Sequence, residues 1–211
     1  MTANTSTLSV PVGVTPAGEQ LTVDLRSNSA VLVAGIAGSG KSEMLRRMRY
    51  ALERQLDTDH LFHAQGIRAG ADAVILAAYE EMQGRLREPS RIADGPAVLL
   101  VDDYGAMSIG RDAMDELIQA VREVALKGRA SDVHLIIATQ GTEGLSCELQ
   151  MNMSARIVLG RLVSPISRIF SEQERELIAG AGITATDRGD GVVVGVNEQP
   201  IPFIALSRES R

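Results

Sequence analysis

The chain has 211 residues, of which 45% are apolar and 23% charged, and its formal net charge is −6. This composition is that of a globular protein with one sizeable core, and the acidic total argues against a protein that coats nucleic acid through contacts with its phosphates. The single cysteine, Cys147, excludes an intrachain disulfide and a cysteine-rich zinc site.

Residues 1–18 are polar and turn-rich, so we expect a flexible N-terminal arm, or else an edge strand, before a single domain over residues 19–211. Apolar runs predict buried strands, and apolar residues at helical spacing, such as Met114 in residues 110–127, predict helices. In chain order, the expected elements are strand 20–24, strand 30–34, helix 41–55, strand 60–64, helix 70–87, strand 97–101, helix 110–127, strand 133–138, strand 155–159, helix 171–179, and strands 191–196 and 201–206.

Strands that alternate with helices predict an α/β fold with a mostly parallel sheet flanked by helices. The last two strands are separated by a short turn that ends in Pro200, which predicts a β-hairpin at the C-terminal end. We find no internal repeat and no interdomain linker, so one domain is the simplest interpretation.

A phosphate-binding motif follows the first buried strand. The stretch matches G-x-x-x-x-G-K-[ST], the P-loop pattern, and is followed by a predicted helix, as the motif requires. Its glycines let backbone N–H groups point at phosphates, and the helix presents the positive end of its dipole to the same anion. We therefore expect ATP to bind here, with Lys41 on the β- and γ-phosphates and Ser42 on Mg²⁺. The residues are Gly35, Ile36, Ala37, Gly38, Ser39, Gly40, Lys41 and Ser42.

Polar side chains at the ends of two other buried strands complete the predicted site. Asp102 and Asp103 follow the run AVLLV, and we expect Asp102 to hold Mg²⁺ and Asp103 to activate water. Many P-loop ATPases have Glu at the second position, so the shorter Asp103 predicts altered geometry or slow turnover. Gln140, at the end of the strand over residues 133–138, is the expected sensor of the γ-phosphate; a solvent-exposed turn is its alternative.

Several motifs together resemble the FtsK/SpoIIIE branch of the FtsK–HerA superfamily of motor ATPases. The stretch LKGRASDVHLIIATQ is similar to that family's G-R-x-x-x-[IV]-H-L-x-x-A-T-Q, VLLVDDYGAM to its second acidic motif, and RGDGVVVG to its C-terminal Gly-rich turn. PVGVTPAGEQLTVDL resembles its short hairpin before the P-loop, and NMSARIVLGR resembles the conjugative coupling ATPases of Gram-positive mobile elements. The resemblance covers about residues 10–205 and implies a RecA-like P-loop NTPase domain.

Three features depart from the family. The stretch between the P-loop helix and Asp102 is short, and the family's D-P-K segment is replaced by LFHAQGI. The family's C-terminal winged-helix module is not expected from these residues, so we do not expect directed DNA pumping by this chain alone. The VDDY form of the acidic motif also resembles later ATPase modules of type VII secretion motors, which act on protein.

The resemblance also implies an arginine that completes the active site of a neighbouring subunit. Candidates are Arg85, in the stretch that resembles the family's E-M-x-x-R segment, Arg129 in the G-R motif, and Arg156 at the start of a strand. A solvated arginine is the alternative for each. Residues 41–54 carry several further arginines, which either line a DNA path, pair with acids across an interface, or form a solvated helix face.

The leading expectation is a Mg²⁺-dependent ATPase that moves double-stranded DNA as a hexameric homo-oligomeric ring, in transfer, partitioning or packaging. The alternatives are a type VII-like protein-secretion module and a nucleotide-binding regulatory subunit that hydrolyses slowly or not at all. No apolar run approaches the ~20 residues that span a bilayer, and the start of the chain lacks the pattern of a signal peptide. We expect a cytoplasmic protein with no direct membrane insertion, which a membrane-anchored partner could recruit.

Overall fold

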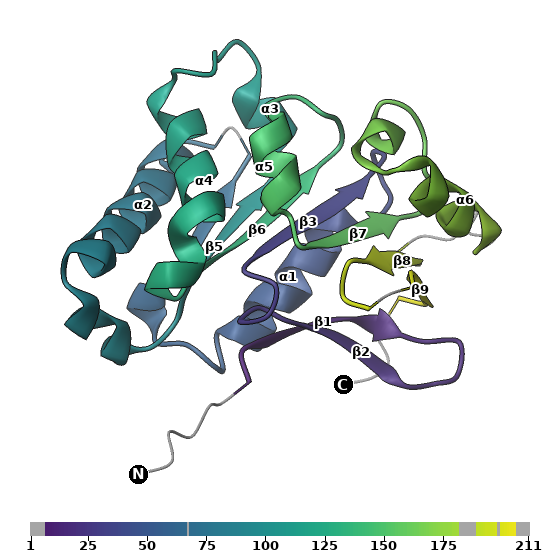
Figure 1. The fold of residues 1–211 in the computed structure, drawn as a ribbon, viewed down its shortest axis with the longest axis horizontal. Coiled ribbons are helices and arrows are strands. Elements are labelled where there is room, and N and C mark those ends of the chain that lie inside the picture. The colour runs from purple at the N-terminus through teal and green to yellow at the C-terminus, as the bar shows by residue number, and fades with distance from the viewer. Residues whose placement is uncertain (1–6, 67, 182–188, 198, 206–211) are drawn as a thin grey trace.

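The computed structural model describes residues 7–66, 68–181, 189–197 and 199–205. Within these ranges its centre is a seven-stranded sheet in the order β4-β5-β6-β3-β7-β8-β9 (Figure 1). Neighbouring strands from β4 to β7 run parallel, and β7, β8 and β9 pair antiparallel, so the expected mostly parallel α/β sheet is confirmed. The strands are β3 (Ala30–Gly35), β4 (Leu61–Gln65), β5 (Ala97–Asp102), β6 (Val133–Thr139), β7 (Ala155–Leu159), β8 (Gly191–Val194) and β9 (Ile201–Phe203).

Helices cover both faces of the sheet. One face packs against α2 (Ala71–Arg87), α3 (Tyr104–Ser108), α4 (Glu116–Lys127), α5 (Cys147–Asn152) and α6 (Glu172–Gly180), and the other against α1 (Lys41–Leu52). Short 3₁₀ turns are η1 (Thr58–His60), η2 (Pro89–Asp94), η3 (Gly128–Ser131) and η4 (Ile166–Ile169). None of the described helices is long and apolar enough to cross a bilayer.

The central strand β3 separates two hydrophobic cores. Its side chains alternate, so that Leu32 packs with α2 and α4 while Val31 and Val33 pack with α1. All three are fully buried, and each such side chain contributes about 1.5–3 kcal/mol through removal from water. The uninterrupted apolar run in the sequence is therefore a strand with both faces covered.

A two-stranded hairpin lies against α1, outside the main sheet (Figure 1). It consists of β1 (Ser9–Val14) and β2 (Gln20–Asp24), which pair antiparallel. Gln55, just after α1, exchanges two hydrogen bonds with the backbone of Ser9, and a bridge joins Val14 to Ile204 beyond β9. The hairpin suggested by the family resemblance is thus present, and the folded domain begins before residue 19. Residues 1–6 of the expected arm lie outside the described residues.

The helix expected over residues 110–127 is wrong in its first part. The chain forms the short α3, turns at Gly110 with φ of 78°, and begins α4 only at Glu116. The Asp115 side chain caps α4 by accepting a hydrogen bond from the Leu117 N–H at 3.0 Å, a stronger start signal than the apolar spacing that precedes it. Met114, expected on the apolar face, is 81% exposed.

Smaller differences concern element ends. Helix α1 ends at Leu52 rather than at residue 55, and α5 was not expected. The C-terminal hairpin is confirmed as β8 and β9, although the strand expected over residues 201–206 ends at Phe203, and residue 206 lies outside the described residues.

Candidate functional site

The P-loop connects the end of β3 to the start of α1 at the carboxyl edge of the parallel strands. Gly38 and Gly40 have φ of 78° and 107°, in the left-handed region where a side chain is strained. At Gly35, a Cβ atom would lie 2.5 Å from Ser39 Oγ and 2.7 Å from the Leu159 carbonyl oxygen. These glycines are therefore required by the tight curl of the loop.

The interior of the loop fits an anion. Ser39 Oγ is buried without a hydrogen-bond partner among the described residues. An orphaned buried hydroxyl costs free energy unless a ligand or water satisfies it. Because α1 also presents its N-terminal N–H groups here, the loop has the donors that a phosphate group needs.

Lys41 is buried at the base of the loop. Its Nζ donates hydrogen bonds to the carbonyl oxygens of Gly35 and Ile36, both at 2.8 Å. Burial lowers the pKa of Lys41, while the charges of Asp103 and Asp102 act in the opposite direction. The end of β5, which carries Asp102 and Asp103, lies at the same edge of the sheet as the P-loop.

Asp103 and Gln140 are brought together from neighbouring strands. Asp103 follows β5 and Gln140 follows β6, which lies between β5 and the P-loop strand β3. Gln140 Nε2 donates a hydrogen bond to Asp103 Oδ1 at 3.3 Å. Asp103 has φ of 55°, a left-handed conformation that is uncommon for a residue with a side chain and is concentrated at functional sites.

The residues expected to hold magnesium have suitable chemistry and placement. Ser42 is exposed in the first turn of α1, and Asp102 is half-buried at the end of β5. Among the described residues, no group of three or more His, Cys, Asp or Glu could hold a metal ion. A phosphate-bound Mg²⁺ needs only one or two carboxylates, because phosphates and waters supply the other ligands. The pair Ser42 and Asp102 fits that role.

Arg85, one of the three candidates for an arginine that serves a neighbouring subunit, is engaged inside its own domain. Its side chain is fully buried in its own domain. Nε donates to Glu81 at 2.7 Å and Nη1 to the Gly95 carbonyl at 2.7 Å. Gly95 precedes β5, so Arg85 lies at the edge of the sheet opposite the P-loop, where it joins α2 to the chain before β5.

The other two arginine candidates differ in their surroundings. Arg156 pairs with Glu174, donates to the Ile169 carbonyl at 3.1 Å and lies over the Phe170 ring, so it is engaged in its own domain. Arg129, in η3, is exposed, and no hydrogen bond or ion pair of its side chain occurs within the described part of the chain. Arg129 therefore remains a candidate for the arginine that completes the active site of a neighbouring subunit.

The arginines of α1, and Arg54 just after the helix, contact partners close to them in the sequence. Arg46 and Arg47 both pair with Glu43, Arg49 pairs with Glu53, and Arg54 lies over the Tyr50 ring at 4.6 Å. This pattern matches a solvated helix face with local ion pairs more closely than an open basic path for DNA.

The sequence missed a contact between the P-loop and the C-terminal strands. The Gly189 N–H donates to the Ser39 carbonyl at 2.9 Å, and the Gly40 backbone lies against Gly189. The Gly-rich stretch RGDGVVVG was identified only through its family resemblance, and its first residue lies outside the described residues. A pocket beside Gly40, lined partly by Met44 and Arg47, was also missed, because both residues have the spacing of an ordinary amphipathic helix.

Neither a protein-family model nor a curated protein matches the sequence. Solved structures do share its fold. The pCW3 conjugation coupling protein TcpA, in a monomer form with ATPγS, is 20% identical, with a TM-score of 0.74 over 96% of this chain and 67% of that chain.

Two further structures are similar. The cytoplasmic domain of the type VII secretion ATPase EccC from Thermomonospora curvata is 19% identical, with a TM-score of 0.68 over 97% of this chain and 30% of that chain. The genome packaging NTPase B204 of Sulfolobus turreted icosahedral virus 2, with AMPPCP, is 14% identical, with a TM-score of 0.61 over 86% of this chain and 99% of that chain.

The chain therefore has the fold of FtsK-like ATPase modules, and the resemblance to coupling proteins and type VII modules is confirmed at the level of the fold. It spans less than a third of the EccC cytoplasmic domain and about two thirds of TcpA.

Proposed function

We propose that the chain is a Mg²⁺-dependent ATPase of the FtsK-like motor type. The hydrogen bond from Gln140 to Asp103, at the same edge of the sheet as the P-loop, carries this proposal. It unites residues from three strands of the sheet in the arrangement that phosphoryl transfer to water needs.

Each residue has a defined part in the proposed reaction. Lys41 neutralises charge on the β- and γ-phosphates, and Asp103 orients the attacking water. Gln140, bonded to Asp103, responds to the γ-phosphate and links its presence to β6. Ser42 and Asp102 would hold Mg²⁺, which supplies further neutralisation of the phosphate charge.

We propose double-stranded DNA as the polymer and a hexameric ring as the working form. TcpA is described as a conjugation coupling protein and B204 as a genome packaging NTPase, and both share the fold. The exposed Arg129 is our candidate for the arginine that reaches the site of a neighbouring subunit. A membrane-anchored partner would place the ring where transfer occurs.

A protein-secretion module is the second candidate. Structures of EccC share the fold at similar TM-scores, one of them in complex with a signal sequence peptide. The net charge of −6 and the local pairing of the α1 arginines favour a protein substrate over a DNA substrate. A regulatory subunit with slow hydrolysis is the third, supported by the short Asp103 side chain.

ATPase measurements with and without long double-stranded DNA distinguish these candidates. The motor predicts a several-fold rise in rate with DNA, loss of activity in Lys41→Ala, and a six-subunit mass with ATPγS. Stimulation by a signal-sequence peptide and not by DNA would instead support the secretion module. A monomer whose hydrolysis ignores both polymers would contradict the motor proposal.

A further inference from the structure

The turn η3, which carries Arg129, ends at a residue with an unusual backbone. Asp132 has φ of 54°, and Asp103 and Asp132 are the two residues other than glycine with positive φ in the part of the chain that the structure describes. Such a conformation persists only where the surrounding structure enforces it, and it is concentrated at functional sites. Asp103 belongs to the candidate active site, whereas Asp132 lies at the opposite edge of the sheet, directly before β6.

The Asp132 carboxylate joins two other parts of the chain to this turn. Oδ1 accepts a hydrogen bond from His134 Nε2 at 2.9 Å, and Oδ2 forms an ion pair with Arg26 Nη2 at 3.4 Å. Burial raises the pKa of Asp132, but the hydrogen bond with His134 and the charges of Arg26 and Arg85 outweigh burial and lower this pKa. The carboxylate is therefore ionised and has a partner on each oxygen. Because an ionised carboxylate only accepts hydrogen bonds, His134 Nε2 carries the proton between them.

The backbone of the turn is fixed as well. The Asp132 carbonyl oxygen accepts a hydrogen bond from the Ala97 N–H at 2.9 Å, and the buried Ser131 hydroxyl donates one to the Gly128 carbonyl at 2.9 Å. A Cβ atom on Gly128 would lie 2.1 Å from a backbone oxygen of β6, so the turn packs directly against that strand. Arg129 is thus an exposed side chain on a fixed base.

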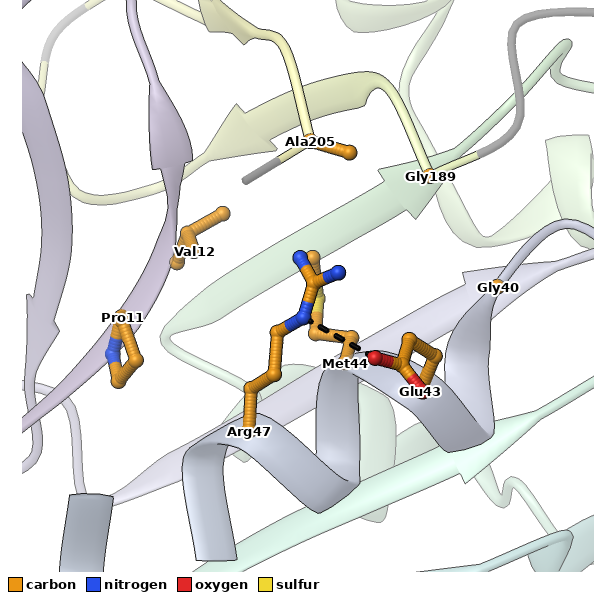
Figure 2. A pocket seen from close by; sticks show the side chains of 8 residues that line it. All are labelled: Pro11, Val12, Gly40, Glu43, Met44, Arg47, Gly189 and Ala205. Carbon is orange, nitrogen blue, oxygen red and sulfur yellow. Dashed lines mark hydrogen bonds and ion pairs between the residues drawn. The ribbon is translucent and has the colours of Figure 1, made fainter. Parts of the chain in front are cut away.

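Arg26 connects this turn to the half of the domain that carries the P-loop. It follows β2, at the end of the N-terminal hairpin. The other strand of the hairpin faces α1, and Figure 2 shows Pro11 and Val12 of β1 across a pocket from this helix. The hairpin therefore lies against the helix that follows the P-loop and also, through Arg26, contacts the residue that ends η3.

We propose that Asp132 is a positioning residue for the intersubunit arginine: held by His134 and Arg26, it fixes the turn from which Arg129 reaches a second copy of the chain. This inference rests on the proposed role of Arg129 at a neighbouring active site, and it adds the groups that hold Arg129 in place before the subunits meet. A side chain on a fixed base loses less freedom on docking, which leaves more of its interaction energy for the transition state.

Steady-state ATPase kinetics of Asp132→Asn test the inference. Asn has a similar shape and tolerates the left-handed backbone, but it has no charge and only one acceptor oxygen. Because the arginine acts in the transition state, kcat should fall about tenfold while KM for ATP is unchanged. This loss is smaller than the ~10³-fold loss expected when such an arginine is removed. In a chain that already carries Arg129→Ala, Asp132→Asn should cause no further loss.

The matched control is Asp94→Asn. Asp94 is an exposed carboxylate at the same edge of the sheet, and its side chain makes no hydrogen bond or ion pair within the described ranges. Its replacement should change neither kcat nor KM.

Mixed subunits separate positioning from folding. Lys41→Ala subunits keep Asp132 and Arg129, so they should complete the active sites of Asp132→Asn neighbours. The mixture should then hydrolyse ATP faster than the mean of the two separate rates. A purely structural defect stays within its own subunit and gives only the mean, which would overturn the inference.

Arg26→Met approaches the carboxylate from the hairpin and leaves η3 unchanged, so it tests the inference even if Asp132→Asn does not fold. Its kcat should fall about threefold, on the scale of a partly exposed ion pair. Full activity of the two variants, or a further loss when either is added to Arg129→Ala, contradicts the inference. If Arg129→Ala is inactive while both variants are fully active, only this inference fails. A fully active Arg129→Ala would also remove the intersubunit role from the proposed function.

Discussion

At the scale of single residues, Asp103 combines two unusual properties. Its backbone occupies the left-handed region, and its carboxylate accepts a hydrogen bond from Gln140. Asp and Asn tolerate this backbone conformation better than other residues with side chains. A Glu residue would fit less well there, so the conformation offers a physical reason for Asp at a position where related motors have Glu.

The replacement Asp103→Asn tests the role of this carboxylate. Because Asn keeps the shape and tolerates the backbone, we expect an unchanged melting temperature and normal ATP binding. Loss of the base should lower the rate of phosphate release by about 10²-fold or more. Phosphate release in steady state, beside ATP titration, measures both. Undiminished hydrolysis in this variant would exclude Asp103 as the group that activates water.

Most polar residues of the candidate site could be proposed from the sequence, because a P-loop and strand-terminal acids have local signatures. Asp103 and Gln140 could be brought together only through the expected parallel sheet. The burial of Arg85 was not predicted, because the sequence does not report which arginine of a helix is buried. The pocket beside Gly40 was missed because its walls come from α1, the hairpin and Ala205, which are distant in sequence.

At the scale of elements, Arg85 is a structural link. It joins α2, through Glu81, to the chain before β5, through the Gly95 carbonyl. A buried charge such as that of Arg85 stabilises the fold only when all of its hydrogen-bond partners are present.

We therefore expect Arg85→Ala to lower the free energy of unfolding by about 3 kcal/mol, since it leaves Glu81 and backbone carbonyls without their donor. Urea denaturation followed by circular dichroism measures this change. The control is Arg87→Ala, an exposed position in the same turn, which should have little effect. Normal stability combined with lost ATPase activity would restore Arg85 as an intersubunit residue.

Element types were predicted better than element limits. The buried strands were found because an uninterrupted apolar run has few other interpretations in a chain of this composition. The division into α3 and α4 was missed because apolar spacing continues through Met114, while the cap at Asp115 decides where the helix begins. A local hydrogen bond thus outweighed the periodic pattern.

At the scale of the whole molecule, the sheet order brings the site together. Strand β3 lies between β6 and β7, and β6 separates it from β5. No sequence pattern predicted this order of strands, which depends on how the helices pack on each side of the sheet. The exposed Arg129 lies at the opposite edge from the P-loop, where β6 begins, so it can reach an active site only in another copy of the chain.

Subunit mixing tests this placement. Lys41→Ala leaves Arg129 intact, and Arg129→Ala leaves the P-loop intact. If Arg129 acts between subunits, each variant alone should be nearly inactive, while an equimolar mixture should hydrolyse ATP faster than the mean of the two. The rate of phosphate release measures the difference. A mixture that shows only the average rate would indicate that Arg129 has no role across subunits.

The hydrogen bonds of Lys41 to the Gly35 and Ile36 carbonyls have a consequence for selectivity among anions. Any ligand that binds the ammonium group must replace both of these hydrogen bonds. The backbone N–H groups of the loop compensate for their loss only when several oxygen atoms of the ligand bind together. A lone orthophosphate offers one group, whereas a triphosphate chain offers three in sequence. We therefore expect the loop to prefer a triphosphate chain to orthophosphate, because the lysine already has hydrogen bonds to its own backbone.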